Sequence, residues 1–277
     1  MARVDPRNRT RYWQAPRVSG LSLMHADLTA HDYAPHSHEA FVVAVTEAGG
    51  AEFNSRGRTD EARESALLVF NPAEPHSGRM AHSQRWRYRA FYLDKASTDA
   101  VNALVGLDGA AYFTANVFQD ADLIASFLAL HRALEGADDL RIQELLALSF
   151  GALIRRHGSR GSRVAAAPRD RNRFETVVAA MHDRHAENLT LGEMSALVDL
   201  TPFQLIGLFK RMGGLTPHSY LTQVRLQAAC EHLRAGLSLA DAALASGFYD
   251  QSALNRHFKR AYAITPRQYL TAHSSAA

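Results

Sequence analysis

The sequence predicts two domains: an all-β barrel with a helical hairpin, then an all-α domain with two tandem helix-turn-helix units. Three observations lead to this prediction. Short strand-like apolar runs give way to a helical period near residue 96. A run of Gly, Ser, Ala, Pro and Arg interrupts the apolar pattern at residues 157–171. The segment FKRMGGLTPHSYL, starting at Phe209, recurs as FKRAYAITPRQYL from Phe258, 49 residues later.

Residues 19–94 are expected to form antiparallel strands. Four apolar runs are bounded by Gly, Pro, Asn and charged turn residues: LSLMHADL, AFVVAVTEAGGAEF, SALLVFNP and RWRYRAFYLD. Several short strands spaced in this way are typical of a barrel or a sandwich.

A helical hairpin is expected at about 117–157. Leu123, Phe127, Leu130 and Leu134 recur at helical spacing, and a second helical run follows the connection GADD. Two such helices joined by a short loop form an antiparallel pair. The pair either only covers the barrel or also carries an apolar surface for homodimerisation, and we favour the homodimer. We therefore place the first domain at 1–157, a flexible basic linker at 158–170 and the second domain at 171–277.

The second domain is expected to contain about seven short helices. Six residues stand where an N-cap is needed, and proline follows three of them at the first helical position, where its missing N–H costs nothing. The six are Thr190, Thr201, Thr216, Ser238, Asp250 and Thr265.

The repeated segment indicates two helix-turn-helix units, in which the second helix of each unit can enter the DNA major groove. The residues expected to contact DNA are Phe203, Gln204, Ile206 and Lys210 in the first unit and Gln251, Ser252, Asn255, Arg256 and Lys259 in the second. Gln, Asn and Arg make bidentate contacts with base edges. A helix from Pro217 to about Ala235 would set the distance between two successive major grooves. Repeated helix pairs also build solenoids, but two copies are few for one.

Composition agrees with a cytoplasmic protein that binds a polyanion. All the excess positive charge lies from Pro168 onward, with 12 Lys and Arg against 9 Asp and Glu. The single cysteine, Cys230, allows no intramolecular disulfide and is expected to be a small buried residue. The basic N-terminus has no apolar segment typical of a signal peptide, and no run is long enough to span a membrane.

The segment ALASGFYDQSALNRHFKRAYAITPRQYL resembles the C-terminal signature of AraC/XylS-type transcriptional regulators. The matching residues are Ala243, Gly247, Phe248, Ser252, Phe258, Lys259, Thr265 and Pro266. Leu254, Ala263 and Leu270 depart from the pattern, and Gly207 stands where family members often carry arginine. Arg225 matches a family arginine, with a structural role or a phosphate contact as equal alternatives. The resemblance implies sequence-specific binding to double-stranded DNA, leans to activation, and adds RNA polymerase as a candidate partner.

The segments YAPHSHEAFVVAVTEAGGAEF and ESALLVFNPAEPHSGRM resemble the two strand motifs of a cupin-type sensor domain. We expect a small organic effector to contact His36, His38, His76, Trp86 and Tyr88, which combine polar tips with apolar bodies.

The three histidines also raise the alternative of a Zn or Fe site. Metal-binding cupins add a glutamate three to four residues after the His-x-His pair, whereas Val42 and Val43 stand there. We therefore expect no metal, no other cofactor and no enzymatic activity. The main alternative function is a cupin-type metalloenzyme with an accessory helical domain. A pure interaction scaffold is the third candidate.

Overall fold

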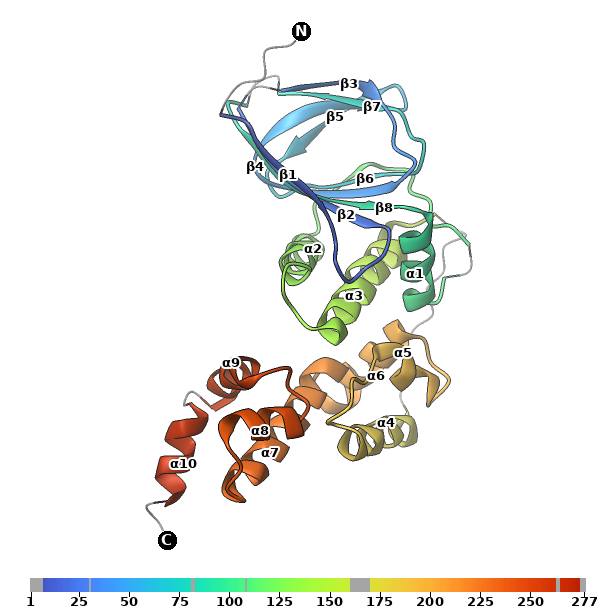
Figure 1. Ribbon diagram of the computed structural model, residues 1–277. Helices are drawn as coiled ribbons and strands as arrows, with labels where there is room; N and C mark the ends of the chain where they lie inside the picture. The colour runs from blue at the N-terminus through green and yellow to red at the C-terminus, as the bar shows by residue number, and fades with distance from the viewer. Residues whose placement is uncertain are drawn as a thin grey trace. The chain divides into compact units, whose positions relative to one another are not determined.

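The computed structural model describes residues 7–29, 31–80, 83–107, 109–159, 170–262 and 265–274. The chain divides into two compact units, one within residues 1–165 and one within residues 166–277 (Figure 1). Each unit is described by itself below. Nearly all of the expected linker at 158–170 lies outside the described residues, as does Ala263.

The first unit is a nine-stranded antiparallel barrel with helices on one side. Its main path of hydrogen-bonded neighbours runs β1-β2-β8-β4-β6-β9, while β7 joins β3 to β4, and β5 pairs with β4. The strands are β1 (Arg9–Gln14), β2 (Leu21–Leu28), β3 (Asp32–His36), β4 (Phe41–Ser55), β5 (Arg58–Arg63), β6 (Leu67–Phe70), β7 (His76–Arg79), β8 (Trp86–Leu93) and β9 (Val117–Phe118).

The long strand β4 belongs to both sheets of the barrel. Its first part, from Phe41, pairs with β6 and β8, and its last part, from Gly50 to Ser55, pairs with β5 and β7. Gly49 has a φ of 68° at the change of partners, and a Cβ there would collide with the Arg85 backbone carbonyl. Only glycine fits this bend, so a single strand can turn the corner of the barrel.

Strand β8 shows how the sequence separates the inside of the barrel from its outer face. Trp86, Tyr88 and Ala90 belong to the buried cluster inside the barrel. The alternate residues Arg89 and Phe91 contact His131 of a covering helix. Because side chains alternate along a strand, the same eight residues line the cavity on one face and form the surface against which the helices pack on the other.

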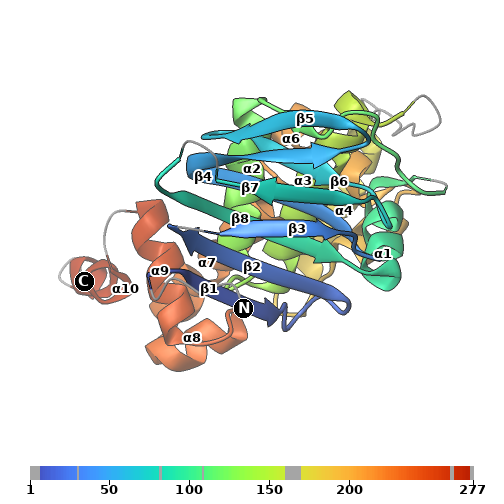
Figure 2. The ribbon, with the colours of Figure 1, turned by 90° about the horizontal axis from the view of Figure 1, so that it is seen from above.

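Three helices cover the outer face of the sheet that contains β2 and β8 (Figures 1 and 2). They are α1 (Lys95–Val105), α2 (Ala121–Ala133) and α3 (Asp139–His157), of which α2 and α3 form the expected hairpin. Phe127 of α2 packs between Phe91 of the sheet and Phe150 of α3, with ring centroids 5.6 and 5.0 Å apart. This aromatic column fastens the hairpin to the barrel.

The second unit has seven helices in its described residues: α4 (Arg171–Asp183), α5 (Leu191–Ala196), α6 (Pro202–Gly213), α7 (Pro217–Arg234), α8 (Leu239–Ala245), α9 (Gln251–Tyr262) and α10 (Pro266–Ser274). All six predicted N-cap side chains accept a hydrogen bond from the backbone N–H three residues later. No helix in the described ranges is both long and apolar enough to cross a lipid bilayer.

The helix pairs α5–α6 and α8–α9 form the two helix-turn-helix units, with α7 between them. The first turn contains Asp199 at a φ of 50°, and the second contains Gly247 at a φ of 80°. Each lies nine residues after the N-cap of the first helix of its unit, Thr190 or Ser238. Both turns therefore reverse the chain through one residue in the left-handed backbone conformation, an aspartate in the first turn and a glycine in the second.

Candidate functional site

A cavity that is partly open to solvent lies inside the barrel. Its wall includes all five residues expected to contact an effector: His36, His38, His76, Trp86 and Tyr88. The rest of the wall is mostly apolar, with Val42, Phe53, Leu68 and Phe70 among its members. An apolar cavity with a few polar tips is the usual form of a small-molecule site.

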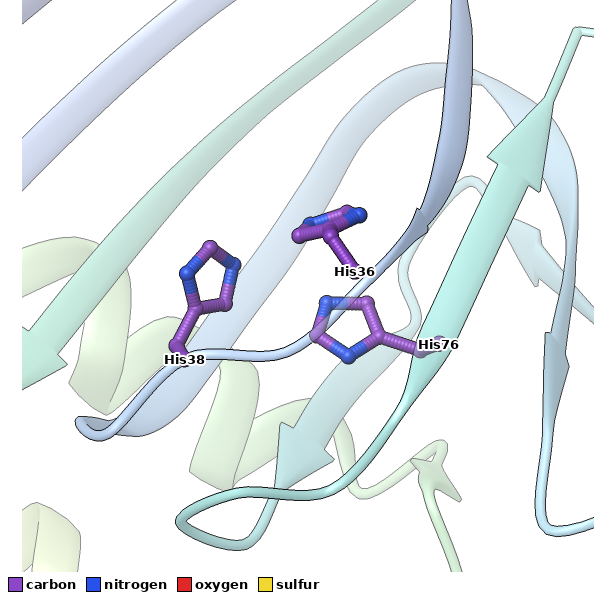
Figure 3. A group of neighbouring side chains, drawn as sticks. All are labelled: His36, His38 and His76. Atoms are coloured by element: carbon purple, nitrogen blue, oxygen red, sulfur yellow. The ribbon is translucent and has the colours of Figure 1, made fainter.

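Three histidine side chains that line this cavity lie close to one another (Figure 3). His36 is at the end of β3, His38 lies just beyond it, and His76 begins β7. One ring nitrogen of each lies within 4.8 Å of the others. Burial lowers the pKa of His38 and of His76 below the ordinary histidine value, and the neighbouring imidazoles lower the pKa of His38 further.

A pair of tyrosines forms a second polar point in the cavity, which the sequence analysis did not single out. The hydroxyl groups of Tyr33 and Tyr88 lie 2.7 Å apart, and Tyr88 also donates to the sulfur of Met24 at 3.7 Å. Tyr92 lines the cavity as well and donates to the same sulfur at 3.4 Å. Burial raises the pKa of all three phenols, so they remain neutral donors at pH 7. The clue in the sequence was the inward alternation of β8, which places Tyr92 on the same face as Tyr88.

A buried carboxylate fixes the loop before β7. Both oxygens of Glu74 are engaged by a set of donors at Ser55, Arg56, Asn71 and Asn116. Burial alone would raise the pKa of Glu74, but these hydrogen bonds hold it at about 2. The Nδ1 atom of His76 lies 2.9 Å from the backbone carbonyl oxygen of Glu74. The ring orientation of His76 therefore depends on a rigid, charged loop.

His131, a buried residue of helix α2, contacts strands β2 and β8 of the cavity wall from the outer side of the sheet. Arg89 contacts Nδ1 of His131 at 3.1 Å, and the Nε2 of His131 lies 3.2 Å from the backbone oxygen of Met24. An arginine can only donate and a carbonyl can only accept, so His131 is neutral with its proton on Nε2. Burial, followed by the Arg89 charge, lowers the pKa of His131 to about 4. Met24 thus contacts the cavity tyrosines with its sulfur and α2 with its carbonyl.

Tyr12 and Trp13 precede the cavity residues in the chain. They lie in the edge strand β1, which pairs with β2 along its whole length. Trp13 contacts the ring of His131, while Tyr12 contacts the ring of Tyr92.

Helix α9 presents a polar stripe to solvent. Gln251, Ser252, Arg256 and Lys259 are exposed and Asn255 is half-buried. The opposite side of the helix buries Leu254 and Phe258 in a cluster with α7 and α8. All five predicted contact residues of this helix thus lie away from its core face, as a base-reading helix requires. Ala261, near the end of the same helix, is also exposed.

Helix α6 differs from the expectation. Phe203 and Ile206, predicted on the DNA-facing side, are buried, with 8% and 0% of their surface exposed. The apolar arc of this helix is wide enough to include them as well as Leu205, Leu208 and Phe209, because α6 packs against α4, α5 and α7. The side chain of Gln204 accepts from the N–H of Thr201 in a capping box. The exposed charged residues of α6 are Lys210 and also Arg211, which the sequence analysis missed.

The comparisons with known proteins agree with this two-unit arrangement. Residues 19–150 match the model of an AraC-like ligand binding domain, and residues 194–272 match that of a helix-turn-helix domain. The chain is 30% identical over 219 residues to the HTH-type transcriptional regulator YbfI of Bacillus subtilis, covering 78% of this chain and 79% of that protein. The chain belongs to the AraC/XylS-type family of transcriptional regulators.

A second relative of this AraC-type regulator is also named as a regulator. The chain is 27% identical to the probable transcriptional regulator LumQ of Photobacterium leiognathi, over 58% of this chain and 63% of the relative. Apo ToxT of Vibrio cholerae, a solved structure, is 12% identical with a TM-score of 0.38, over 91% of this chain and 97% of that one. The protein is a DNA-binding transcriptional regulator with an N-terminal ligand-binding domain, and its relatives are regulators rather than enzymes.

The structure decides between the two alternatives for Arg225 of this AraC-type regulator. Its Nε donates to the backbone oxygen of His185, and one of its terminal nitrogens donates to that of Glu187, both at 2.8 Å. These carbonyls lie in the loop between α4 and α5, while Arg225 lies on α7. The role of Arg225 is therefore structural: it ties the connecting helix to the first helix-turn-helix unit.

Proposed function

We propose that the two recognition helices of this regulator divide the work of binding DNA. Helix α9 reads base edges with Gln251, Asn255 and Arg256, and helix α6 anchors the DNA backbone with Lys210 and Arg211. The observation that carries the proposal is the polar, hydrogen-bonding stripe on α9, whose counterpart on α6 is basic. Amide and guanidinium groups can discriminate bases, whereas lysine and exposed arginine at a phosphate contribute affinity without sequence information.

Footprinting of the full-length protein on the DNA that flanks its own gene, at two salt concentrations, tests this division. Arg256→Ala should relax specificity at one or two base pairs, each worth roughly 1–3 kcal/mol. Arg211→Ala should weaken binding to all sequences about equally and reduce the slope of log affinity against log salt by about 1. The opposite assignment of these two effects would overturn the division. Protection of one major groove only would remove α6 from the interface.

We further propose that the barrel cavity binds a small organic effector that is mainly apolar and carries one polar group. The apolar wall favours the body of such a molecule, and the histidine and tyrosine tips supply the polar partner. Phe53→Trp, which narrows the cavity, should weaken the response of DNA binding to the effector. Tyr112→Trp is the matched control because Tyr112 is 50% exposed in the first unit and does not line the cavity. An unchanged effector response in Phe53→Trp would place the effector elsewhere.

We also propose that the protein acts as a homodimer through the α2–α3 hairpin and activates transcription. An outward stripe on α2 supports the dimer: Ala125 is exposed and Leu128 is half-buried, one turn apart. Ala125→Arg should shift the sedimentation coefficient from dimer to monomer, and a monomeric wild-type protein would contradict the proposal. Transcription in vitro with RNA polymerase, with and without the protein, distinguishes activation from repression.

A further inference from the structure

Tyr249 lies in the turn between α8 and α9, directly before Asp250, the N-cap of the recognition helix α9 (Figure 1). Tyr249 is 89% exposed, whereas its neighbour Phe248 is buried. We propose that the Tyr249 hydroxyl donates a hydrogen bond to a DNA phosphate at the rim of the major groove and thereby fixes how α9 enters the groove. This proposal deepens the proposed base-reading role of α9 and rests on it.

The fold makes no use of the Tyr249 side chain. A residue directly before an N-cap often packs against the fourth residue of its helix, which fixes how the chain enters the helix. In α9 that fourth residue is Leu254, which is fully buried in the cluster with α7 and α8. Tyr249 does not share this burial, and among the described residues its side chain has no hydrogen-bond or ring partner. Its hydroxyl is therefore available to a ligand.

The first helix-turn-helix unit has no equivalent side chain at this place. Leu200 lies directly before the N-cap Thr201, as Tyr249 lies before Asp250, but Leu200 is half-buried. A leucine side chain can neither donate nor accept a hydrogen bond. The second unit therefore carries, at the start of its recognition helix, a hydrogen-bond donor that the first unit lacks. This difference agrees with the proposed assignment of base reading to α9.

The position of Tyr249 at the start of α9 indicates a phosphate as its partner. A recognition helix contacts base edges with its N-terminal residues, and Gln251 and Ser252 are exposed at this end. The residue before them lies where the helix crosses the rim of the groove, and tyrosine is among the side chains that bind phosphates. The Asp250 carboxylate accepts from the N–H of Ala253 at 2.6 Å, and its negative charge opposes a phosphate directly at the helix end. A long, uncharged side chain can reach a phosphate beyond that carboxylate.

A phosphate contact through a hydroxyl differs measurably from the other proposed DNA contacts. Phosphates carry no sequence information, so the loss of this contact weakens binding to every sequence alike. A hydroxyl neutralises no phosphate charge and releases no counterion, so its loss leaves the slope of log affinity against log salt unchanged. Arg211→Ala should reduce that slope, and Arg256→Ala should act on particular base pairs. The three variants should therefore give three different results.

The test measures the affinity of full-length Tyr249→Phe, which lacks only the hydroxyl group, for two synthetic duplexes of equal length. One duplex contains the sequence that the wild-type protein protects in the footprint, and the other contains a scrambled sequence. We expect the affinity for both duplexes to fall about three- to tenfold, the usual effect of one hydrogen bond, with an unchanged salt slope. Tyr112→Phe is the matched control, because Tyr112 is an exposed tyrosine of the first unit, and it should leave both affinities unchanged. Circular dichroism checks that both variants keep the wild-type helix content.

Ethylation of the DNA phosphates identifies the contacted group. Ethylated phosphates that the protein contacts should interfere with binding, and one of these positions should lose its interference in Tyr249→Phe while the others keep theirs. Unchanged affinity, a loss confined to the footprinted duplex, or a reduced salt slope would overturn the phosphate contact. If Arg256→Ala still relaxes specificity in that case, the base-reading role of α9 stands without Tyr249. Failure of the wild-type protein to bind either duplex would overturn the proposed function and this contact together.

Discussion

Replacing Gly247 by alanine should destabilise the helical unit far more than the same change at a comparable glycine. Gly247 has a φ of 80° in the turn between α8 and α9, and Gly236, after α7, has a φ of 91°. Alanine in the left-handed region costs roughly 1–2 kcal/mol at either position. A Cβ at Gly236 would meet no atom within 4 Å. Gly236→Ala therefore measures the backbone penalty alone.

At Gly247 the added Cβ meets backbone that cannot easily move. It would lie 2.4 Å from the carbonyl oxygen of His185 and 2.9 Å from the Cα of Ala186. Displacing this loop also breaks the hydrogen bond from Arg225 to His185, and hydrogen bonds to charged groups contribute about 1.5–3 kcal/mol. Together with the φ penalty, Gly247→Ala should cost about 3–5 kcal/mol.

Urea denaturation of the full-length protein can resolve this difference. Both tryptophans, Trp13 and Trp86, lie in the barrel unit, so their fluorescence follows that unit. The far-ultraviolet circular dichroism signal includes the seven helices of the second unit. We expect Gly247→Ala to shift the dichroism transition and to leave the fluorescence transition in place. Equal destabilisation by Gly247→Ala and Gly236→Ala would refute the steric reasoning.

Three further predictions concern single side chains. Arg225→Met should lower the unfolding free energy of the helical unit by about 2–4 kcal/mol. Arg225→Lys should retain less than half of the stability that Arg225→Met loses, because one ammonium group cannot reach two carbonyls as a guanidinium does. Unchanged urea midpoints in both variants would contradict the structural role. Ile206→Ala should lower the same unfolding free energy by about 2–5 kcal/mol, whereas Lys210→Ala should lower it by less than about 0.5 kcal/mol. An equally small effect of Ile206→Ala would contradict the burial of Ile206. The unfolding free energy of the barrel should fall by up to about 3 kcal/mol as the pH falls from 6.5 to 4. In this range His131 is protonated in the unfolded chain but stays neutral in the folded one, because its pKa there is about 4. Trp13 fluorescence in urea at each pH measures the loss, and an equal slope in His131→Gln would assign it to other groups, among them the facing Arg89, His25 and Glu47.

The sequence was most informative where local chemistry decides the structure. The six N-caps begin the helices as predicted, because the capping side chain and its N–H lie three residues apart in the chain. The four apolar runs became β2, β4, β6 and β8 because each carries strand residues that a core must bury. Other strands were not among these runs: β1 and β5 were missed, and β9 falls in the segment that was assigned to the helical hairpin. β5, RTDEAR, has mostly charged, exposed residues and forms only by pairing with β4.

The errors came from contacts between distant parts of the chain. The helical period of α6 was recognised, but Phe203 and Ile206 were assigned to its outer side. Choosing the inner side required knowing that α4, α5 and α7 all pack against this short helix. The bend at Gly49 depends on the approach of Arg85, 36 residues later. The cavity residues His36 and His76 were named from a family resemblance. Tyr92 could have been found from the alternation along β8, whereas the position of Tyr33 depends on the pairing of β3 with β7, which no local pattern encodes.

The hydrogen bonds of Arg225 have a consequence for the architecture of promoters. Arg225 fixes α7 to the loop before α5, and Gly247 brings the second turn against the same loop, so the two recognition helices share one frame. An extra base pair between their two half-sites would rotate one groove by roughly 35° relative to the other. A rigid frame cannot follow that rotation without twisting the DNA or releasing one helix. Insertions of single base pairs should therefore be far more harmful to an operator than many base substitutions within it.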